Sequence, residues 1–191
     1  SCHDWTGRYP HCLRGVYGEG HPAIALLGEF DALPSLSQEA GNAVQTPICA
    51  GGNGHGCGHN LLGAGSMAAA FAIKHYLEEK GEGSGKVILY GCPGEEGAAT
   101  KAFMARDGVF KECDAALTWH PGTENQVTSG TCNTCIQTEY KFTGVASHAA
   151  GAPEQGRSAL DAVELMNIGV QFLREHMPDT ARIHYSITDA G

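Results

Sequence analysis

The chain has 191 residues, a formal net charge of −9 at pH 7 and 42% hydrophobic residues. These values are typical of a globular protein with one domain, or with one domain and part of another. The basic residues form no cluster that would follow a nucleic-acid backbone, and no apolar run approaches the length of a membrane span. We therefore expect neither a nucleic-acid nor a membrane partner. The first residues also lack the basic and apolar regions of a secretory signal.

The eight cysteines favour a reducing compartment over a disulfide framework. The chain is longer than the small secreted domains in which disulfides replace a core. Cys92 lies in the apolar run VILYGCP, where a reduced thiol packs as a small hydrophobic group. Cys132 and Cys135 form a lone C-x-x-C before a predicted strand, and we interpret both as packing residues. These observations predict a cytoplasmic protein.

Strand and helix patterns alternate through the first two thirds of the chain. They predict, in order, a strand over 22–30, a helix over 61–81, a strand over 86–92, a short helix over 99–110 and a strand over 114–122. The three strands are continuous apolar runs, which is typical of strands buried on both faces. The order predicts an α/β fold with a mostly parallel sheet and helices on both faces. Residues 1–20 show no clear period.

The pattern changes near residue 132. An alternating stretch over 135–148 and a run over 182–188 predict strands, and an amphipathic helix is predicted between them over 157–177. This segment resembles the opening of a separate α+β unit. We therefore expect part of an α/β domain over 1–132 and the beginning of a second, α+β domain over 133–191.

Side chains that can bind a ligand follow each predicted strand of the first domain. They are Glu29 and Asp31 after the first strand, Glu95 and Glu96 after the second, and His120 after the third, with Cys57 and His59 in the glycine-rich loop GNGHGCGHN between the first strand and its helix. Sites in open α/β sheets form beyond the carboxyl ends of the strands. We therefore expect these four segments to converge on one place.

The residue types select the chemistry of this place. Thiolate, imidazole and carboxylate donors together suit zinc or another borderline divalent ion such as manganese. Asp31 is placed to orient a ligating imidazole. Of two adjacent carboxylates, one can bind metal while the other takes a proton from an activated water. This chemistry is that of amide hydrolysis.

Five motifs together resemble a known family. GEFDALP, GHGCGHN, PGEEG, TWHPG and FTGVASHAAGAPEQGRSALDA, in this order and spacing, are similar to the M20 amidohydrolases and carboxypeptidases, and most similar to the aminobenzoyl-glutamate hydrolase branch. The resemblance covers residues 16–191. It implies a two-metal catalytic domain that is interrupted by a smaller lid and dimerisation domain.

The resemblance also implies roles for individual residues. Four would bind two divalent ions, Mn or Zn: Cys57, His59, Glu96 and His120. Glu95 would be the general base, and Asp31 would orient a ligand. His148, in the lid, would reach the active site of a partner subunit and stabilise the developing oxyanion. The implied substrate is a small amide with a free carboxylate, of the aminoacyl- or aminobenzoyl-glutamate type. The implied partner is a second copy of the chain or a related second subunit.

The chain also departs from the family. Members are considerably longer and supply one more histidine ligand after the lid, so we expect this chain to be a fragment that is inactive by itself. Residues 1–15 do not resemble the family.

Other functions stay open at this point. One is a truncated or inactive relative that serves only binding or dimerisation. Another is a hydrolase that uses Cys57 as a nucleophile with His59, although neighbours two apart on an irregular loop rarely have that geometry. Each motif also has a purely structural interpretation, as a tight turn for Cys57 and His59 or as a solvated turn for Glu95 and Glu96.

Overall fold

The computed structural model describes residues 2–4 and 11–191. Residues 1 and 5–10, part of the stretch in which the sequence predicts no element, lie outside the described residues. The chain divides into two compact units, Ser1–Asn125 and Gln126–Gly191. No described helix is both long and apolar enough to cross a membrane.

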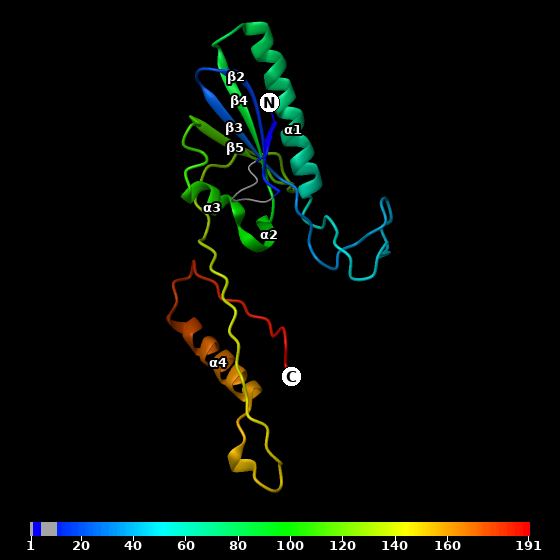
Figure 1. The fold of residues 1–191 in the computed structure, drawn as a ribbon, viewed down its shortest axis with the longest axis vertical. Helices are drawn as coiled ribbons and strands as arrows, with labels where there is room; N and C mark the ends of the chain where they lie inside the picture. Colours follow the sequence, from blue (N-terminus) through cyan, green and yellow to red (C-terminus); the bar gives the residue numbers. More distant parts are fainter. Residues whose placement is uncertain (1, 5–10) are drawn as a thin grey trace. The chain divides into compact units, whose positions relative to one another are not determined.

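The first unit is built on a five-stranded sheet of order β1-β2-β4-β3-β5 (Figure 1). Its strands are β1 (Cys2–Asp4), β2 (Leu13–Glu19), β3 (Ala23–Glu29), β4 (Gly85–Cys92) and β5 (Ala115–Thr118). The three predicted strands, β3, β4 and β5, pair in parallel, which confirms the α/β class. Strands β1 and β2 add an antiparallel edge that the sequence did not predict.

Helices cover both faces of this sheet, as predicted. They are α1 (His59–Lys80), α2 (Glu95–Ala98) and α3 (Thr100–Arg106), and Figure 1 shows α1 running along one face. Strand β3 alternates between two cores. Leu26 packs on the α1 side with Leu77, and Ala25 packs on the opposite side with Met104 of α3. The continuous apolar run of β3 therefore results from burial on both faces. The same prediction is wrong for β5, which lies at the edge of the sheet and whose four residues are all exposed.

Helix α1 lies close to the sheet through its small and polar residues. Ser66 Oγ donates a hydrogen bond to the Leu27 carbonyl at 3.4 Å, and Trp119 Nε1 donates to the Leu62 carbonyl at 3.2 Å. Not every apolar residue of this helix is packed, because Met67 and Phe71 are 49% and 56% exposed.

The second unit contains the helix α4 (Ala159–Leu173) and two short 3-10 turns, η1 (Pro153–Gln155) and η2 (Arg174–His176). The Ser158 side chain caps α4 by accepting a hydrogen bond from the backbone N–H of Asp161. No residue of α4 is buried. In the apolar stripe of the predicted helix, Val163, Met166 and Val170 are half-buried, whereas Leu173 is 48% exposed.

The two strands predicted for the second unit, 135–148 and 182–188, are absent. Both segments lack regular secondary structure, and the one backbone pairing within this unit is an isolated bridge between Val145 and Arg157. A strand is stabilised by hydrogen bonds to a neighbour, and an alternating pattern alone supplies none. The alternating pattern thus identified segments that are suited to a sheet, but it does not show whether a neighbouring strand is present.

The cysteines show one correct and one incorrect prediction. Cys92 is fully buried and is a free thiol, as predicted. Cys132 and Cys135 are free but exposed, so the interpretation of both as packing residues is wrong. All seven cysteines whose side chains are described are unpaired.

Candidate metal centre

The carboxyl ends of the three parallel strands lie side by side. Glu29, the last residue of β3, pairs in register with Cys92, the last residue of β4. Leu27 of β3 pairs with Thr118, the last residue of β5. The segments that follow these strands, which carry the predicted site residues, therefore begin at one edge of the sheet.

The glycine-rich loop is held against these segments by close backbone contacts. Gly54 pairs with Leu33, and a Cβ on Gly54 would lie 1.7 Å from the Leu36 carbonyl oxygen. Gly58 has φ +78°, and a Cβ there would lie 2.8 Å from Pro121. Glycine is required at both positions because any side chain would separate the loop from its neighbours. Helix α1 begins directly afterwards, at His59.

His59 is oriented by a carboxylate. Its side chain is 1% exposed, and its Nδ1 lies 3.0 Å from Asp31 Oδ1. The other oxygen of Asp31 accepts a hydrogen bond from the backbone N–H of Glu96 at 3.0 Å. A carboxylate at Nδ1 favours the tautomer that carries its proton there, which leaves the Nε2 lone pair available. Asp31 therefore lies where it can orient the His59 ring, and its role beside a metal ligand stays a prediction.

Three carboxylates surround His59 Nε2. Glu29 Oε2 lies at 3.1 Å, Glu96 Oε1 at 3.8 Å and Glu95 Oε2 at 3.9 Å. His59 Nε2, Glu29 Oε2 and Glu96 Oε1 are all buried, and none has a hydrogen-bond partner among the described residues. Buried electron-pair donors that face one another without a partner are unfavourable, and a cation between them removes that cost. These residues therefore fit a divalent metal ion.

A thiol and a second imidazole complete the cluster. Cys57 Sγ lies 3.2 Å from His120 Nε2, and the rings of His59 and His120 meet edge to face at 5.7 Å. The ligand atoms form two groups, each within 4.8 Å: Cys57, His59 and His120 in one, and Glu29, His59 and Glu95 in the other. The structure therefore shows two donor groups that share His59.

The predicted site residues distribute unevenly over these groups. Cys57, His59 and His120, three of the four predicted ligands, form the first group. Glu96, the fourth, belongs to neither. The second group includes Glu95, which we predicted to be the base, and Glu29, which we counted among the side chains able to bind a ligand but not among the four metal ligands.

The acidic surroundings act on the thiol. The pKa of Cys57 is raised by a hydrogen bond to the Glu96 carboxylate, by burial, and by the charges of Glu96, Glu95 and Asp31. The thiol therefore keeps its proton in the absence of a cation. A thiolate donor would form as metal binds, because ligation releases that proton.

Sequence reasoning missed Lys101. It lies in α3, and its ammonium group contacts Glu29 Oε1. Burial lowers the pKa of Lys101. Lysine is common on helix surfaces, and no spacing signal connects this one with the strand ends. Only the close packing of α3 against the sheet reveals the contact.

His148 lies in the second unit, at a turn. Its Nδ1 accepts hydrogen bonds from the backbone N–H groups of Ala150 and Gly151, at 3.2 and 2.9 Å. The ring is exposed. The role that we predicted for His148 in a partner's active site stays a prediction.

An α/β sheet with donors gathered beyond its parallel strands is the kind of domain in which enzymes place their active sites. The sequence matches the model of peptidase family M20/M25/M40 over residues 25–188, and the chain belongs to this family. The resemblance found in the motifs is therefore confirmed.

Individual relatives agree with this assignment. The chain is 53% identical over 190 residues to one subunit of the p-aminobenzoyl-glutamate hydrolase of Escherichia coli (strain K12), covering 97% of this chain and 38% of the relative. It is 34% identical to the Xaa-Arg dipeptidase of Mus musculus, covering 88% of this chain and 35% of the relative. The chain thus spans less than half the length of these relatives.

One crystal structure, of an aminohydrolase from methicillin-resistant Staphylococcus aureus, has the same fold. The TM-score is 0.57 at 20% identity, covering 93% of this chain and 48% of the other.

Proposed function

We propose that this chain provides metal-binding and catalytic residues of a hydrolase that cuts an amide bond next to a free carboxylate. The proposed substrate is of the aminoacyl- or aminobenzoyl-glutamate type. The names of the relatives support this class, since p-aminobenzoyl-glutamate, Xaa-Arg and indole-3-acetyl-aspartic acid each join an amino acid through an amide. Family membership supports the reaction type.

One observation carries the proposal of a metal-dependent mechanism. His59 Nε2, Glu29 Oε2 and Glu96 Oε1 are buried, face one another and have no hydrogen-bond partner among the described residues. We propose Cys57, His59, Glu96 and His120 as ligands of two divalent ions, Mn or Zn, with Glu29 beside them. Asp31 would hold the His59 ring in place.

The reaction would use the two adjacent glutamates differently. Divalent ions at such a site make water more acidic and polarise an amide carbonyl. Glu95 would take the proton from the attacking water and deliver it to the leaving amine. Its side chain is 41% exposed, whereas that of Glu96 is 26% exposed. The more exposed carboxylate suits contact with water and substrate.

We assign residues 1–132 to a catalytic domain and 133–191 to a lid and dimerisation domain. In this proposal His148 acts in the active site of a partner subunit, and the protein works in the cytoplasm as a homodimer or with a related second subunit. The second possibility has support from two relatives in E. coli that are named as different subunits of p-aminobenzoyl-glutamate hydrolase. One of them is 53% identical to the chain and the other is 29% identical.

The structure disfavours a cysteine nucleophile. Cys57 Sγ is within hydrogen-bonding distance of His120 Nε2, at 3.2 Å, whereas no hydrogen bond joins it to His59 among the described residues. The pKa of the Cys57 thiol is raised by Glu96, whereas a nucleophilic cysteine needs a lowered pKa. A role as a metal ligand agrees better with these surroundings.

The test uses the complete gene product and p-aminobenzoyl-glutamate. We expect a chelator to abolish hydrolysis and added Mn²⁺ or Zn²⁺ to restore it. Hydrolysis that survives the chelator and is blocked by a thiol alkylator would contradict the proposal and favour the cysteine mechanism. Metal binding without hydrolysis would favour a relative that only binds or dimerises.

A further inference from the structure

We propose that Lys101 is a positioning residue that acts as a fixed counter-cation of the metal site and limits its affinity for divalent ions through Glu29. This inference rests on the proposed metal-binding function. Nothing in the motifs of the sequence singles out Lys101.

The two carboxylate oxygens of Glu29 have different contacts. Its side chain is 8% exposed, and Oε1 receives the ammonium group of Lys101. Oε2 points instead to His59 Nε2, at 3.1 Å, and has no hydrogen-bond partner among the described residues. Lys101 therefore satisfies one oxygen and leaves the other directed into the donor cluster. The carboxylate is thus presented to a cation by a single oxygen.

The position of Lys101 is fixed by the core of the domain. Lys101 is the second residue of α3, and Met104, one turn later, is 2% exposed within the core beneath the sheet. The helix therefore cannot move away without disturbing this core. Its packing places the lysine beside the end of β3.

The net charge of the cluster is consistent with Lys101 as a counter-cation beside two divalent ions. Its carboxylates are Glu29, Asp31, Glu95 and Glu96, and ligation adds the thiolate of Cys57. These groups carry five negative charges, and Lys101 supplies one positive charge. Two divalent ions supply the remaining four. The ammonium group thus balances a site built for two ions.

The same charge opposes metal binding. A nearby positive charge repels a divalent ion in a partly buried site, where the effective dielectric constant is far below that of water. Removing this charge at Lys101 will tighten metal binding about tenfold or more. An ion pair with a purely structural role would lower the melting temperature on removal and leave the metal affinity unchanged.

The experiment measures the Kd of Zn²⁺ and Mn²⁺ for the complete gene product by competition with a chromogenic chelator. We expect Lys101→Met to lower the Kd about tenfold or more and Lys101→Arg to keep the wild-type value. Lys74→Met is the matched control, because Lys74 pairs with Glu78 away from the cluster. Its Kd should not change.

Glu29→Gln tests whether Lys101 affects the metal affinity through Glu29. It removes a donor charge and leaves Lys101 without its partner, so we expect the Kd to rise about tenfold. Circular dichroism verifies that each variant folds, and Lys101→Gln replaces Lys101→Met if the latter does not.

Two results separate this inference from the proposed function. A wild-type protein that binds no divalent ion overturns the proposed metal site and this inference with it. A wild-type protein that binds metal, with an unchanged or raised Kd in Lys101→Met, overturns only the role of Lys101.

Discussion

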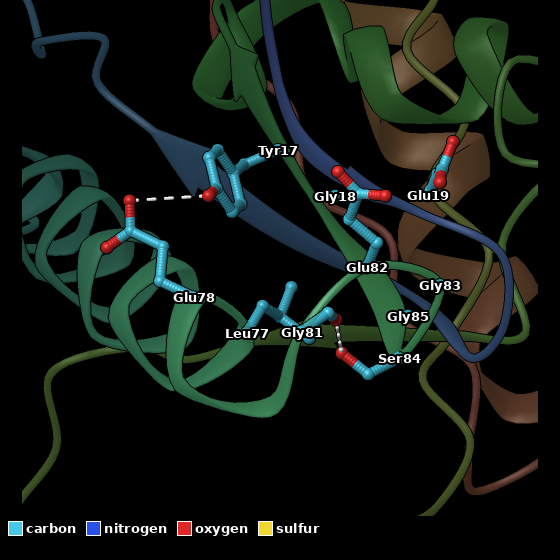
Figure 2. Close-up of a pocket in the computed structure, with 10 residues that line it drawn as sticks. All are labelled: Tyr17, Gly18, Glu19, Leu77, Glu78, Gly81, Glu82, Gly83, Ser84 and Gly85. Atoms are coloured by element: carbon cyan, nitrogen blue, oxygen red, sulfur yellow. Dashed lines mark hydrogen bonds between the residues drawn. The ribbon is translucent and has the colours of Figure 1, made fainter.

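The two ends of helix α1 each carry an acidic cluster, and the clusters differ in how their charges are satisfied. At the carboxyl-terminal end lies a pocket of about 510 Å³, shown in Figure 2. One of its glutamates, Glu78, accepts hydrogen bonds from Tyr17, Lys74 and His75. At the amino-terminal end, three buried atoms, His59 Nε2, Glu29 Oε2 and Glu96 Oε1, have no hydrogen-bond partner among the described residues.

The comparison shows that neither a pocket nor the number of acidic side chains is enough to identify a candidate metal site. The pKa of Glu78 is lowered, first by Lys74 and then by His75, so its charge is already stabilised by the protein. At His59, three buried electron-pair donor atoms face one another without a hydrogen-bond partner among the described residues, an arrangement that fits a cation. Burial together with unpartnered donors distinguishes the second cluster from the first.

The largest expected effect is on catalysis. Glu95→Gln removes the proposed base but keeps the size of the side chain. We expect kcat for p-aminobenzoyl-glutamate to fall about 10²- to 10⁴-fold. Metal content, measured by atomic absorption, should stay at the wild-type level. Glu82→Gln, in the pocket at the other end of α1, is the control and should keep full activity. Retained turnover in Glu95→Gln would remove Glu95 from its proposed role.

The next effect concerns the packing that supports the cluster. Leu62 is fully buried in the first turn of α1, three residues after His59, whereas its neighbour Leu61 is 60% exposed. We expect Leu62→Ala to lower the free energy of unfolding by about 2–5 kcal/mol. Leu61→Ala should change it by less than about 0.5 kcal/mol. Urea denaturation measures both, and equal effects would contradict the described packing.

A smaller effect is expected from the residue that orients His59. Asp31→Asn keeps the shape of the side chain but removes the charge that fixes the His59 tautomer. We expect the Kd for Zn²⁺ to rise about 10- to 100-fold. Glu78→Gln, in the other cluster, should leave the Kd unchanged. An unchanged Kd in Asp31→Asn would show that the ring is held by packing alone.

The smallest effect concerns the end of β4. Burial raises the pKa of Cys92 from 9.0 to about 12. Below pH 9 the thiol is protonated in both the folded and the unfolded chain, so its stabilising contribution is complete. Between pH 9 and 12 only the unfolded chain loses the proton, and stability falls by about 1.4 kcal/mol per pH unit. We expect Cys92→Ala to reduce the slope of unfolding free energy against pH by that amount. An unchanged slope would contradict the raised pKa.

Most of the first unit could be predicted from local patterns. The runs that became β3 and β4 are apolar because both of their faces are covered, and such runs are visible in the sequence. The run that became β5 is equally apolar, but this strand lies at the edge of the sheet and all of its residues are exposed. Strand β2 was missed because Gly15 and Gly18 interrupt a half-buried segment. Its place in the sheet depends on antiparallel pairing with β4, and no local signal encodes a distant partner.

Only part of the site could be predicted, because sequence patterns place the ends of strands but not the contacts between distant side chains. Residues that follow parallel strands must begin at one edge, so the meeting of Cys57, His59 and His120 followed from topology. The position of Glu29 at the end of β3 followed from the same topology, but its contact with Lys101 depends on the packing of α3, which the sequence does not reveal. In the second unit, the predicted strands required neighbours that the pattern could not supply.

X-ray absorption spectroscopy of the zinc-loaded protein tests the metal site most directly. We predict one sulfur neighbour at about 2.3 Å together with nitrogen or oxygen neighbours at about 2.0–2.1 Å. The sulfur contribution should disappear in Cys57→Ala. Zinc that binds without a sulfur neighbour, or a folded protein that retains no zinc, would contradict the account.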